Sequence, residues 1–170
     1  MKRNKVAVIG LGNRLLSDEG AGLHAIDLLR DRLETEDRNG GSPLDIDLVE
    51  AGTPGMNLLH QFDEREKIIF IDAGNCGLKD GEYRRFFPGE AISNKKSKGY
   101  SLHEFDLMSF LEFAKQMNMT ENVEIVIYCL QASEISMSEQ LSPVAEKTLP
   151  GLVRAVYNEV KTGKYGENHA

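Results

Sequence analysis

Four side chains with acid–base or metal-binding chemistry lie where apolar runs end or helical patterns begin. Glu19 lies in "GLGNRLLSDEGAG" (10–22), Glu50 ends "LDIDLVE", Asp72 ends "KIIFID", and His103 lies in "SLHE". A carboxylate that ends a buried strand must be hydrated, hydrogen-bonded or bound to a ligand. Carboxylate oxygens and a neutral imidazole nitrogen form a donor set for a divalent cation, and carboxylates also serve as general acids or bases.

The segments that carry these residues alternate between strand and helix patterns. Continuous apolar or alternating runs predict the strands, and apolar positions three and four residues apart predict the helices. Strands are expected at Val6–Leu11, Leu44–Glu50, Lys67–Asp72, Tyr83–Phe87 (near an edge) and Glu124–Leu130, with a short helix at Met56–Phe62.

Local capping signals predict where the longer helices begin. Ser17 is expected as an N-cap followed by the first-turn acids Asp18 and Glu19, and Ser101–Glu104 reads as a capping box. Ser142–Pro143 places a cap before a proline at the first helical position, which predicts the start of the C-terminal helix. Pro150 is expected to kink or interrupt that helix.

This alternation predicts an α/β protein, a three-layer α/β/α sandwich around a mostly parallel sheet. We expect one domain over residues 1–163 and a frayed tail over 164–170. In such sheets ligands bind outside the carboxyl ends of the strands. Glu19, Glu50, Asp72 and His103 are therefore expected to gather at one edge of the sheet.

Each candidate also has a purely structural interpretation. Glu19 could be a first-turn acid that complements the helix dipole, and Asp18 is better explained in this way than as a ligand. Glu50 could be a solvent-facing residue of a partly wetted strand. His24 and His60 lie within helical patterns and are expected to face solvent or to pack without a chemical role.

Composition excludes several classes of function. The chain has 170 residues and a formal net charge of −7, which argues against a nucleic-acid-binding surface. The first apolar run is too short to cross a membrane.

Cys76 and Cys129 lie 53 positions apart without a CxxC motif, so reduced thiols in a cytoplasmic protein are expected. Cys76 is a poor candidate nucleophile or ligand, and Cys129 reads as a core residue. The lysines of the 88–101 segment read as a solvated loop: Lys95, Lys96 and Lys98.

The stretch "GLGNRLLSDEGAG" resembles the N-terminal signature of the hydrogenase maturation endopeptidases. The resemblance continues in order through "EAGTPGMNLL", "IIFIDAG", "SLHEFDL" and "LSPVAE", and so spans nearly the whole chain. It implies a five-stranded sheet of order 2-1-3-5-4 with the fourth strand antiparallel. It also implies an aspartic-type endopeptidase that removes the C-terminal extension of a nickel–iron hydrogenase large-subunit precursor after nickel insertion.

The resemblance assigns metal binding to Glu19, Asp72 and His103, and a catalytic role to Asp72. Glu50 occupies a position where family members commonly carry Asp, so a catalytic role that requires a fixed reach is open there. Ala132 replaces a proline that often follows the last strand. The metal is expected to be nickel that arrives with the substrate, and zinc or cadmium could take its place in crystals.

Two mechanisms of cleavage stay open at this point. The metal either polarises the scissile carbonyl or activates water, or it only positions the peptide while a carboxylate such as Glu50 acts as base. The expected partner is the precursor, with no nucleic acid or membrane, and the expected state is a monomer. The competing interpretations are a dinucleotide-binding protein and a nickel-dependent assembly chaperone that does not cut. Leu15 at the third-glycine position and the acids Asp18 and Glu19 argue against bound phosphate.

Overall fold

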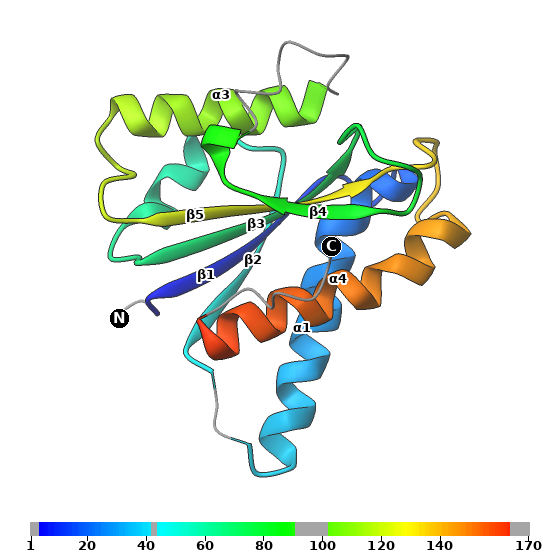
Figure 1. The fold of residues 1–170 in the computed structure, drawn as a ribbon, viewed down its shortest axis with the longest axis horizontal. Helices are drawn as coiled ribbons and strands as arrows, with labels where there is room; N and C mark the ends of the chain where they lie inside the picture. The colour runs from blue at the N-terminus through cyan, green and yellow to red at the C-terminus, as the bar shows by residue number, and fades with distance from the viewer. Residues whose placement is uncertain (1–3, 42–43, 91–101, 164–170) are drawn as a thin grey trace.

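The computed structural model describes residues 4–41, 44–90 and 102–163. The chain forms a parallel sheet with one antiparallel edge strand (Figure 1). The elements follow one another along the chain as β1 (Val6–Leu11), η1 (Ser17–Gly20), α1 (Ala21–Arg38), β2 (Ile46–Gly52), η2 (Met56–Phe62), β3 (Lys67–Gly74), β4 (Tyr83–Phe86), α3 (Leu102–Gln116), β5 (Glu124–Gln131) and α4 (Pro143–Thr162).

The sheet has the strand order β2-β1-β3-β5-β4, and β4 pairs with β5 in the antiparallel sense. The other neighbouring strands pair in parallel. Both the fold class and the order implied by the family resemblance are therefore confirmed. β4 lies at an edge, as its short partly polar sequence indicates, and β3 is buried along nearly its whole length.

Two apolar cores cover the two faces of the sheet. Helices α1 and α4 pack on one face, and η2 and α3 pack on the other (Figure 1). Successive residues of β3 alternate between these cores, with Ile69 and Ile71 facing α1 and α4, and Ile68 and Phe70 facing α3. By the same alternation Asp72 falls on the α3 face.

Two helix predictions need correction and a third is confirmed. Ser17 does not cap an α-helix: it begins the 3-10 helix η1, α1 begins at Ala21, and Asp18 and Glu19 are buried rather than solvated. α4 runs through Pro150 without interruption, because this exposed proline is flanked by the buried anchors Leu149 and Leu152. Ser142 caps α4 as predicted, and its Oγ accepts a hydrogen bond from the amide of Ala145.

Several predictions fall outside the part of the chain that the structure describes. These are Ser101 of the capping box, the lysine-containing segment and the tail at 164–170. Among the described residues, no helix is both long and apolar enough to cross a membrane.

Candidate active site

Two glycines, Gly12 and Gly22, allow the backbone segments around Glu19 to lie close to the carboxyl end of the sheet, because glycine has no Cβ. Gly12 has φ +119°, and a Cβ there would lie 1.7 Å from the carbonyl oxygen of Glu19. A Cβ on Gly22 would lie 2.4 Å from the carbonyl oxygen of Ile71, the residue before Asp72. Larger residues at these two positions would push η1 and α1 away from β1 and β3. The glycines that resemble a phosphate loop therefore bring a carboxylate close to the strand ends.

Asp72 lies near the end of β3, and it is only 3% exposed. Its Oδ1 accepts a hydrogen bond from the backbone amide of Ala73 at 2.8 Å. The 3-10 helix η1, which contains Glu19, packs against β3, and Glu19 itself is 2% exposed. The structure thus holds two of the three predicted metal ligands, both buried, at one end of the sheet.

His103 belongs to the first turn of α3. α3 begins on the side of the molecule at which the parallel strands end, and it covers the face onto which Asp72 falls (Figure 1). The side chain of His103 is outside the described part of the structure. Within the described part, no group of three or more His, Cys, Asp or Glu side chains is arranged to hold a metal ion. The three-residue site therefore stays a prediction that the backbone arrangement favours.

Glu50 is held by two arginines at the end of β2. Arg14 donates from Nη2 to Oε2 at 2.8 Å, and Arg30 donates from Nη2 to Oε1 at 3.2 Å. Asp27 accepts from the same two guanidinium groups, so the four side chains form a closed ring of opposite charges. The hydrogen bond from Arg14 is the main reason why the pKa of Glu50 is lowered. A lower pKa makes this carboxylate a weaker base than an ordinary glutamate.

Asp18 has a role that the sequence interpretation missed. It is fully buried, and its oxygens accept hydrogen bonds from the backbone amides of Ser133, Glu134 and Ser142 at 2.7–3.0 Å. The Ser142 hydroxyl also donates to Oδ2 at 2.8 Å. Asp18 therefore fastens the segment between β5 and α4 to the segment that carries Glu19. Its partners lie 115 to 124 residues further along the chain, so no local sequence pattern reveals this function.

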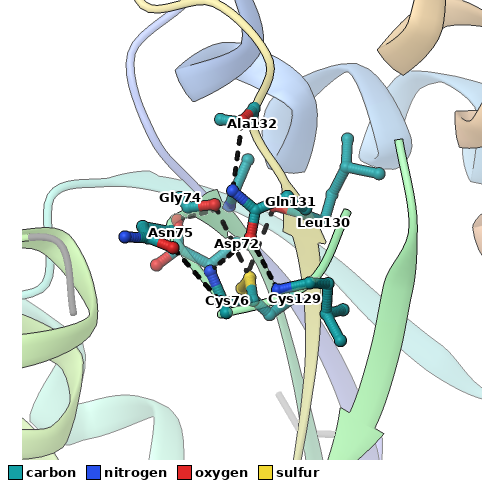
Figure 2. The surroundings of a disulfide bond; sticks show 11 residues. Asp72, Gly74, Asn75, Cys76, Cys129, Leu130, Gln131 and Ala132 are labelled. Carbon is teal, nitrogen blue, oxygen red and sulfur yellow. Dashed lines mark hydrogen bonds between the residues drawn. A yellow bond between two sulfur atoms is a disulfide. The ribbon is translucent and has the colours of Figure 1, made fainter. Parts of the chain in front are cut away.

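The two cysteines form a disulfide, which corrects the prediction of free thiols (Figure 2). Cys129 is the register partner of Asp72 on the neighbouring strand, and Cys76 lies in the loop that leaves β3. Their Cα atoms are 6.4 Å apart, within the range that a disulfide bridges. No local sequence pattern indicates this contact. The two cysteines are 53 residues apart, and they approach each other only because β3 and β5 are neighbours in the sheet. The disulfide also removes the basis on which a reducing compartment was predicted.

Gln131 supports the same loop from the end of β5. Its Oε1 accepts hydrogen bonds from the amides of Cys76 and Leu78 at 2.9 and 3.1 Å (Figure 2 shows the first). The Gln side chain and the disulfide together fix the loop that follows Asp72. The replacement of the expected proline by Ala132 leaves the backbone amide at that position available, and this amide donates to the carbonyl of Gly74 at 2.9 Å.

The other histidines do not join the site. His60 is exposed, and its Nε2 lies 2.9 Å from Nε2 of the neighbouring Gln61. His24 is half-buried in α1, and its Nε2 makes no hydrogen bond. Neither position contradicts the prediction that these residues have no chemical role.

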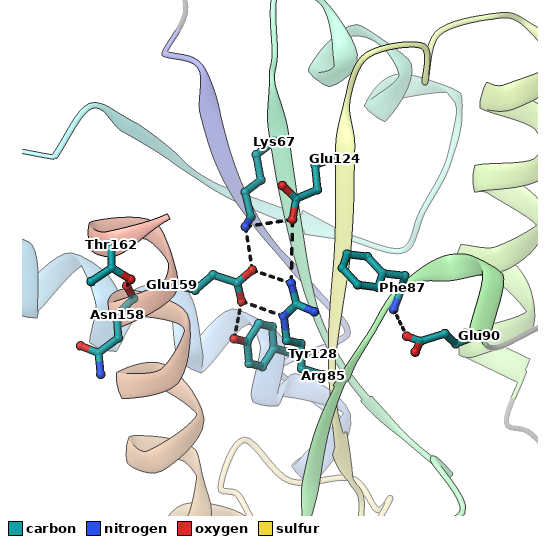
Figure 3. A network of polar contacts seen from close by, with 9 residues as sticks. All are labelled: Lys67, Arg85, Phe87, Glu90, Glu124, Tyr128, Asn158, Glu159 and Thr162. Atoms are coloured by element: carbon teal, nitrogen blue, oxygen red, sulfur yellow. Dashed lines mark hydrogen bonds and ion pairs between the residues drawn. The ribbon is translucent and has the colours of Figure 1, made fainter. Parts of the chain in front are cut away.

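A separate buried polar cluster lies toward the opposite end of the sheet (Figure 3). Glu159 of α4 is 1% exposed, and it accepts hydrogen bonds from Lys67, Arg85 and Tyr128 at 2.6–3.0 Å. Burial by itself raises the pKa of this carboxyl, but the hydrogen bonds from Arg85, Lys67 and Tyr128 together lower it to about 2. Lys67 begins β3, and it also pairs with Glu124, which begins β5. This cluster joins α4 to three strands far from the strand ends that carry Asp72.

Known proteins resemble this chain in sequence and in structure. The family model described as hydrogenase maturation protease matches residues 23–159. A hydrogenase expression/formation protein HupD of Bradyrhizobium diazoefficiens is 25% identical over 126 residues, which cover 74% of this chain and 62% of that protein. A putative hydrogenase maturation protease of Methanocaldococcus jannaschii is 25% identical over 166 residues, which cover 95% of this chain and 99% of that protein. The chain thus matches less than two thirds of the length of HupD relatives, 62% and 52% of two of them, but nearly all of the archaeal protein.

A solved structure has the same fold. The NiFe hydrogenase maturation protease HybD from Thermococcus kodakarensis superposes with a TM-score of 0.74 at 25% identity, over 92% of this chain and 99% of that one. The family model covers far more than half of the chain, and the sheet order agrees with the one that the sequence resemblance implied. The chain belongs to the hydrogenase maturation protease family.

Proposed function

We propose that this protein is an endopeptidase that removes the C-terminal extension from a nickel–iron hydrogenase large-subunit precursor once nickel has been inserted. The nickel belongs to the substrate, and the protein recognises it through Glu19, Asp72 and His103. The protein acts as a monomer, and the proposal of a cytoplasmic reaction rests on the family and not on the cysteines, which form a disulfide. Family membership and the arrangement at the carboxyl ends of the strands support this proposal.

The observation that carries the proposal is the burial of two carboxylates at one end of the sheet. Glu19 and Asp72 are 2% and 3% exposed, and the contact between Gly22 and Ile71 holds their backbone segments together. Bringing two carboxylates out of water at one place is unfavourable unless hydrogen bonds, a cation or a proton compensate them, and a shared cation compensates both at once. A set of two oxygens and one imidazole nitrogen is compatible with nickel, and it leaves coordination positions for ligands from the precursor. The precursor would then be bound through a metal that both proteins share.

Asp72 is the better candidate than Glu50 for proton transfer during the cleavage. Asp72 lies at the strand end among the proposed metal ligands, whereas Glu50 accepts hydrogen bonds from Arg14 and Arg30 in a ring of ion pairs that includes Asp27. Because these arginines lower the pKa of Glu50, that carboxylate accepts a proton less readily. We therefore assign Glu50 to the orientation of the loop that carries Arg14, and we retain the aspartic type for the enzyme on the basis of Asp72.

The test compares nickel-loaded and nickel-free precursor as substrates of the purified protein. Intact mass of the large subunit before and after incubation reports both the cut and its position. We expect a single cut in the loaded precursor only. Asp72→Asn and His103→Ala should reduce the rate by at least about a hundredfold, which is the usual scale for removal of an acid–base group or a binding anchor.

Two exposed residues provide matched controls for these substitutions. Asp63→Asn and His60→Ala change the same residue types at exposed positions near the end of η2, so both variants should cut at the wild-type rate. Equal cutting of loaded and nickel-free precursor would contradict recognition of the metal. Binding of loaded precursor with no change in mass would instead identify an assembly chaperone that does not cleave.

A further inference from the structure

An exposed apolar surface lies beside the candidate active site, and it is formed by Leu15, Ile135 and Met137. These side chains are 52%, 55% and 83% exposed. Leu15 belongs to the loop between β1 and η1, and the other two belong to the segment between β5 and α4. We call these three residues the rim surface.

Hydrogen bonds join the two segments of the rim surface. The amide of Ser138 donates to the carbonyl of Leu15 at 3.0 Å, and the amide of Ser17 donates to the carbonyl of Ser138 at 2.7 Å. Leu16 and Ser138 form a parallel bridge, so Leu15 and Met137 each precede a bridged residue. Leu15 and the 135–137 segment are therefore neighbours in space although 120 residues separate them in the sequence.

The rim surface is built on a rigid support. Asp18 accepts hydrogen bonds from Ser133, Glu134 and Ser142 beneath it, and its own amide donates to the carbonyl of Glu134. Exposed apolar side chains on such a well-anchored segment contribute little to the fold, because each of the three buries less than half of its area within the protein. Clustered exposed apolar residues on an ordered surface are typical of a site for a binding partner.

The charge around the rim surface indicates the chemistry of that partner. Residues 131–146 contain Glu134, Glu139 and Glu146 and no lysine or arginine, and Arg14, which precedes Leu15, is paired with Asp27 and Glu50. Glu134 and Glu139 are exposed and flank Ile135 and Met137 in the sequence. An apolar patch with an acidic border is complementary to a segment that combines apolar and basic side chains.

We propose that the rim surface binds an apolar segment with basic residues in the precursor, next to the bond that is cut. The inference rests on the proposed function, because it assigns the partner as the substrate of the neighbouring site. Continuity with that site supports the assignment: the loop that carries Leu15 leads directly into η1, which carries Glu19. A precursor anchored by its metal on Glu19 and Asp72 is held a second time by this surface, which fixes the direction in which its chain leaves the site.

The test measures steady-state cleavage of nickel-loaded precursor by Met137→Glu and Ile135→Glu. Each change places a charge where an apolar contact is expected, so KM should rise by about tenfold or more while kcat changes less than about threefold. Glu134→Lys/Glu139→Lys should also raise KM, and its effect should decrease at high salt. Met117→Glu is the matched control: Met117 is 56% exposed just beyond the far end of α3, and its KM should equal that of the wild type.

The outcomes separate this inference from the proposed function. If the wild-type protein cuts the loaded precursor and Met137→Glu and Ile135→Glu leave KM unchanged, the rim surface does not bind substrate. If instead these variants change only the sedimentation of the protein from dimer to monomer, the surface is a contact between copies of this chain, and the inference is overturned. If the wild-type protein cuts neither precursor, the proposed function itself fails. Circular dichroism of each variant checks that its fold is intact.

Discussion

The two ends of the sheet each contain a buried carboxylate, but they stabilise it in different ways. Glu159, toward the amino ends of the strands, lies between Lys67, Arg85 and Tyr128, which belong to three strands (Figure 3). Asp18, at the carboxyl ends, lies among backbone amides of a loop and the cap of α4. Cations at the first site fix a helix on the sheet, whereas amide donors at the second fix loops to one another.

This difference indicates which buried carboxylates can still act as a base or bind a cation. A carboxylate already compensated by two cations has a strongly lowered pKa, and it is a poor base and a poor ligand for a further cation. At the other end of the sheet Asp18 fastens the loops through backbone amides, and Glu19 lies buried next to it in η1. Buried acids at the two ends are therefore held in different ways: Glu159 joins a helix to three strands, and Asp18 positions the segment that carries the proposed ligand Glu19.

The largest effect is expected for Glu159→Ala. The substitution leaves Lys67 and Arg85 in a buried region without their shared anion, and the loss of one partner from a buried ion pair costs about 3–5 kcal/mol. Urea unfolding followed by circular dichroism measures the free energy of unfolding. Glu34→Ala removes an exposed glutamate that pairs with Arg38 on the surface of α1, and it should cause a much smaller loss. A loss below about 1 kcal/mol for Glu159→Ala would show that the cluster is not a stabilising element.

Acid should weaken the same cluster within a defined pH range. The pKa of Glu159 is lowered from 4.5 to about 2 in the folded protein, so its contribution to stability is present above the unfolded pKa. The contribution is lost as the pH falls from about 4.5 toward about 2, and it is on the order of 3 kcal/mol. Unfolding of wild type and Glu159→Gln across this range tests the prediction, because the difference between the two proteins should shrink as the pH falls. A constant difference would assign the acid sensitivity to other carboxylates.

Asp18→Asn is expected to produce a smaller and more local effect. The amide side chain loses the charge that strengthens hydrogen bonds to four donors, at a cost of about 1–3 kcal/mol. Faster hydrogen exchange should appear at Ser133, Glu134 and Ser142, and cleavage should slow because the segment that carries Glu19 loosens. Asp80→Asn is the control: Asp80 accepts an exposed side-chain hydrogen bond from the same loop, through Ser133 Oγ. Uniformly faster exchange over the whole sheet in Asp18→Asn would contradict a local role.

The smallest effect is expected for Glu50→Gln. Its ring with Arg14, Arg30 and Asp27 is partly solvated, and exposed ion pairs of this kind contribute less than about 1 kcal/mol. Cleavage should fall less than about tenfold, since Asp72 rather than Glu50 is proposed to transfer the proton. A fall as large as that of Asp72→Asn would return the role of base to Glu50.

The sequence by itself determined most of the elements, and it predicted the edge of the sheet at which chemistry would occur. Apolar periodicity is a local property, so the strands β1 and β3, the short helix η2 and the start of α4 at Pro143 agree with prediction within a few residues. The order of the strands came from the family resemblance, and the structure agrees with it. Asp72 was predicted as a site residue because a carboxylate at the end of an apolar run is unfavourable without a specific reason.

Only the tertiary structure decided the contacts between distant segments. The disulfide joins residues 53 positions apart, and Asp18 binds a loop more than 110 residues away. The charged ring around Glu50 combines β2 with a loop and a helix that precede it, and the rim surface brings together two loops from opposite ends of the chain. Local patterns carry no information about such pairs, because parallel strands place residues side by side according to sheet order and not according to distance along the chain.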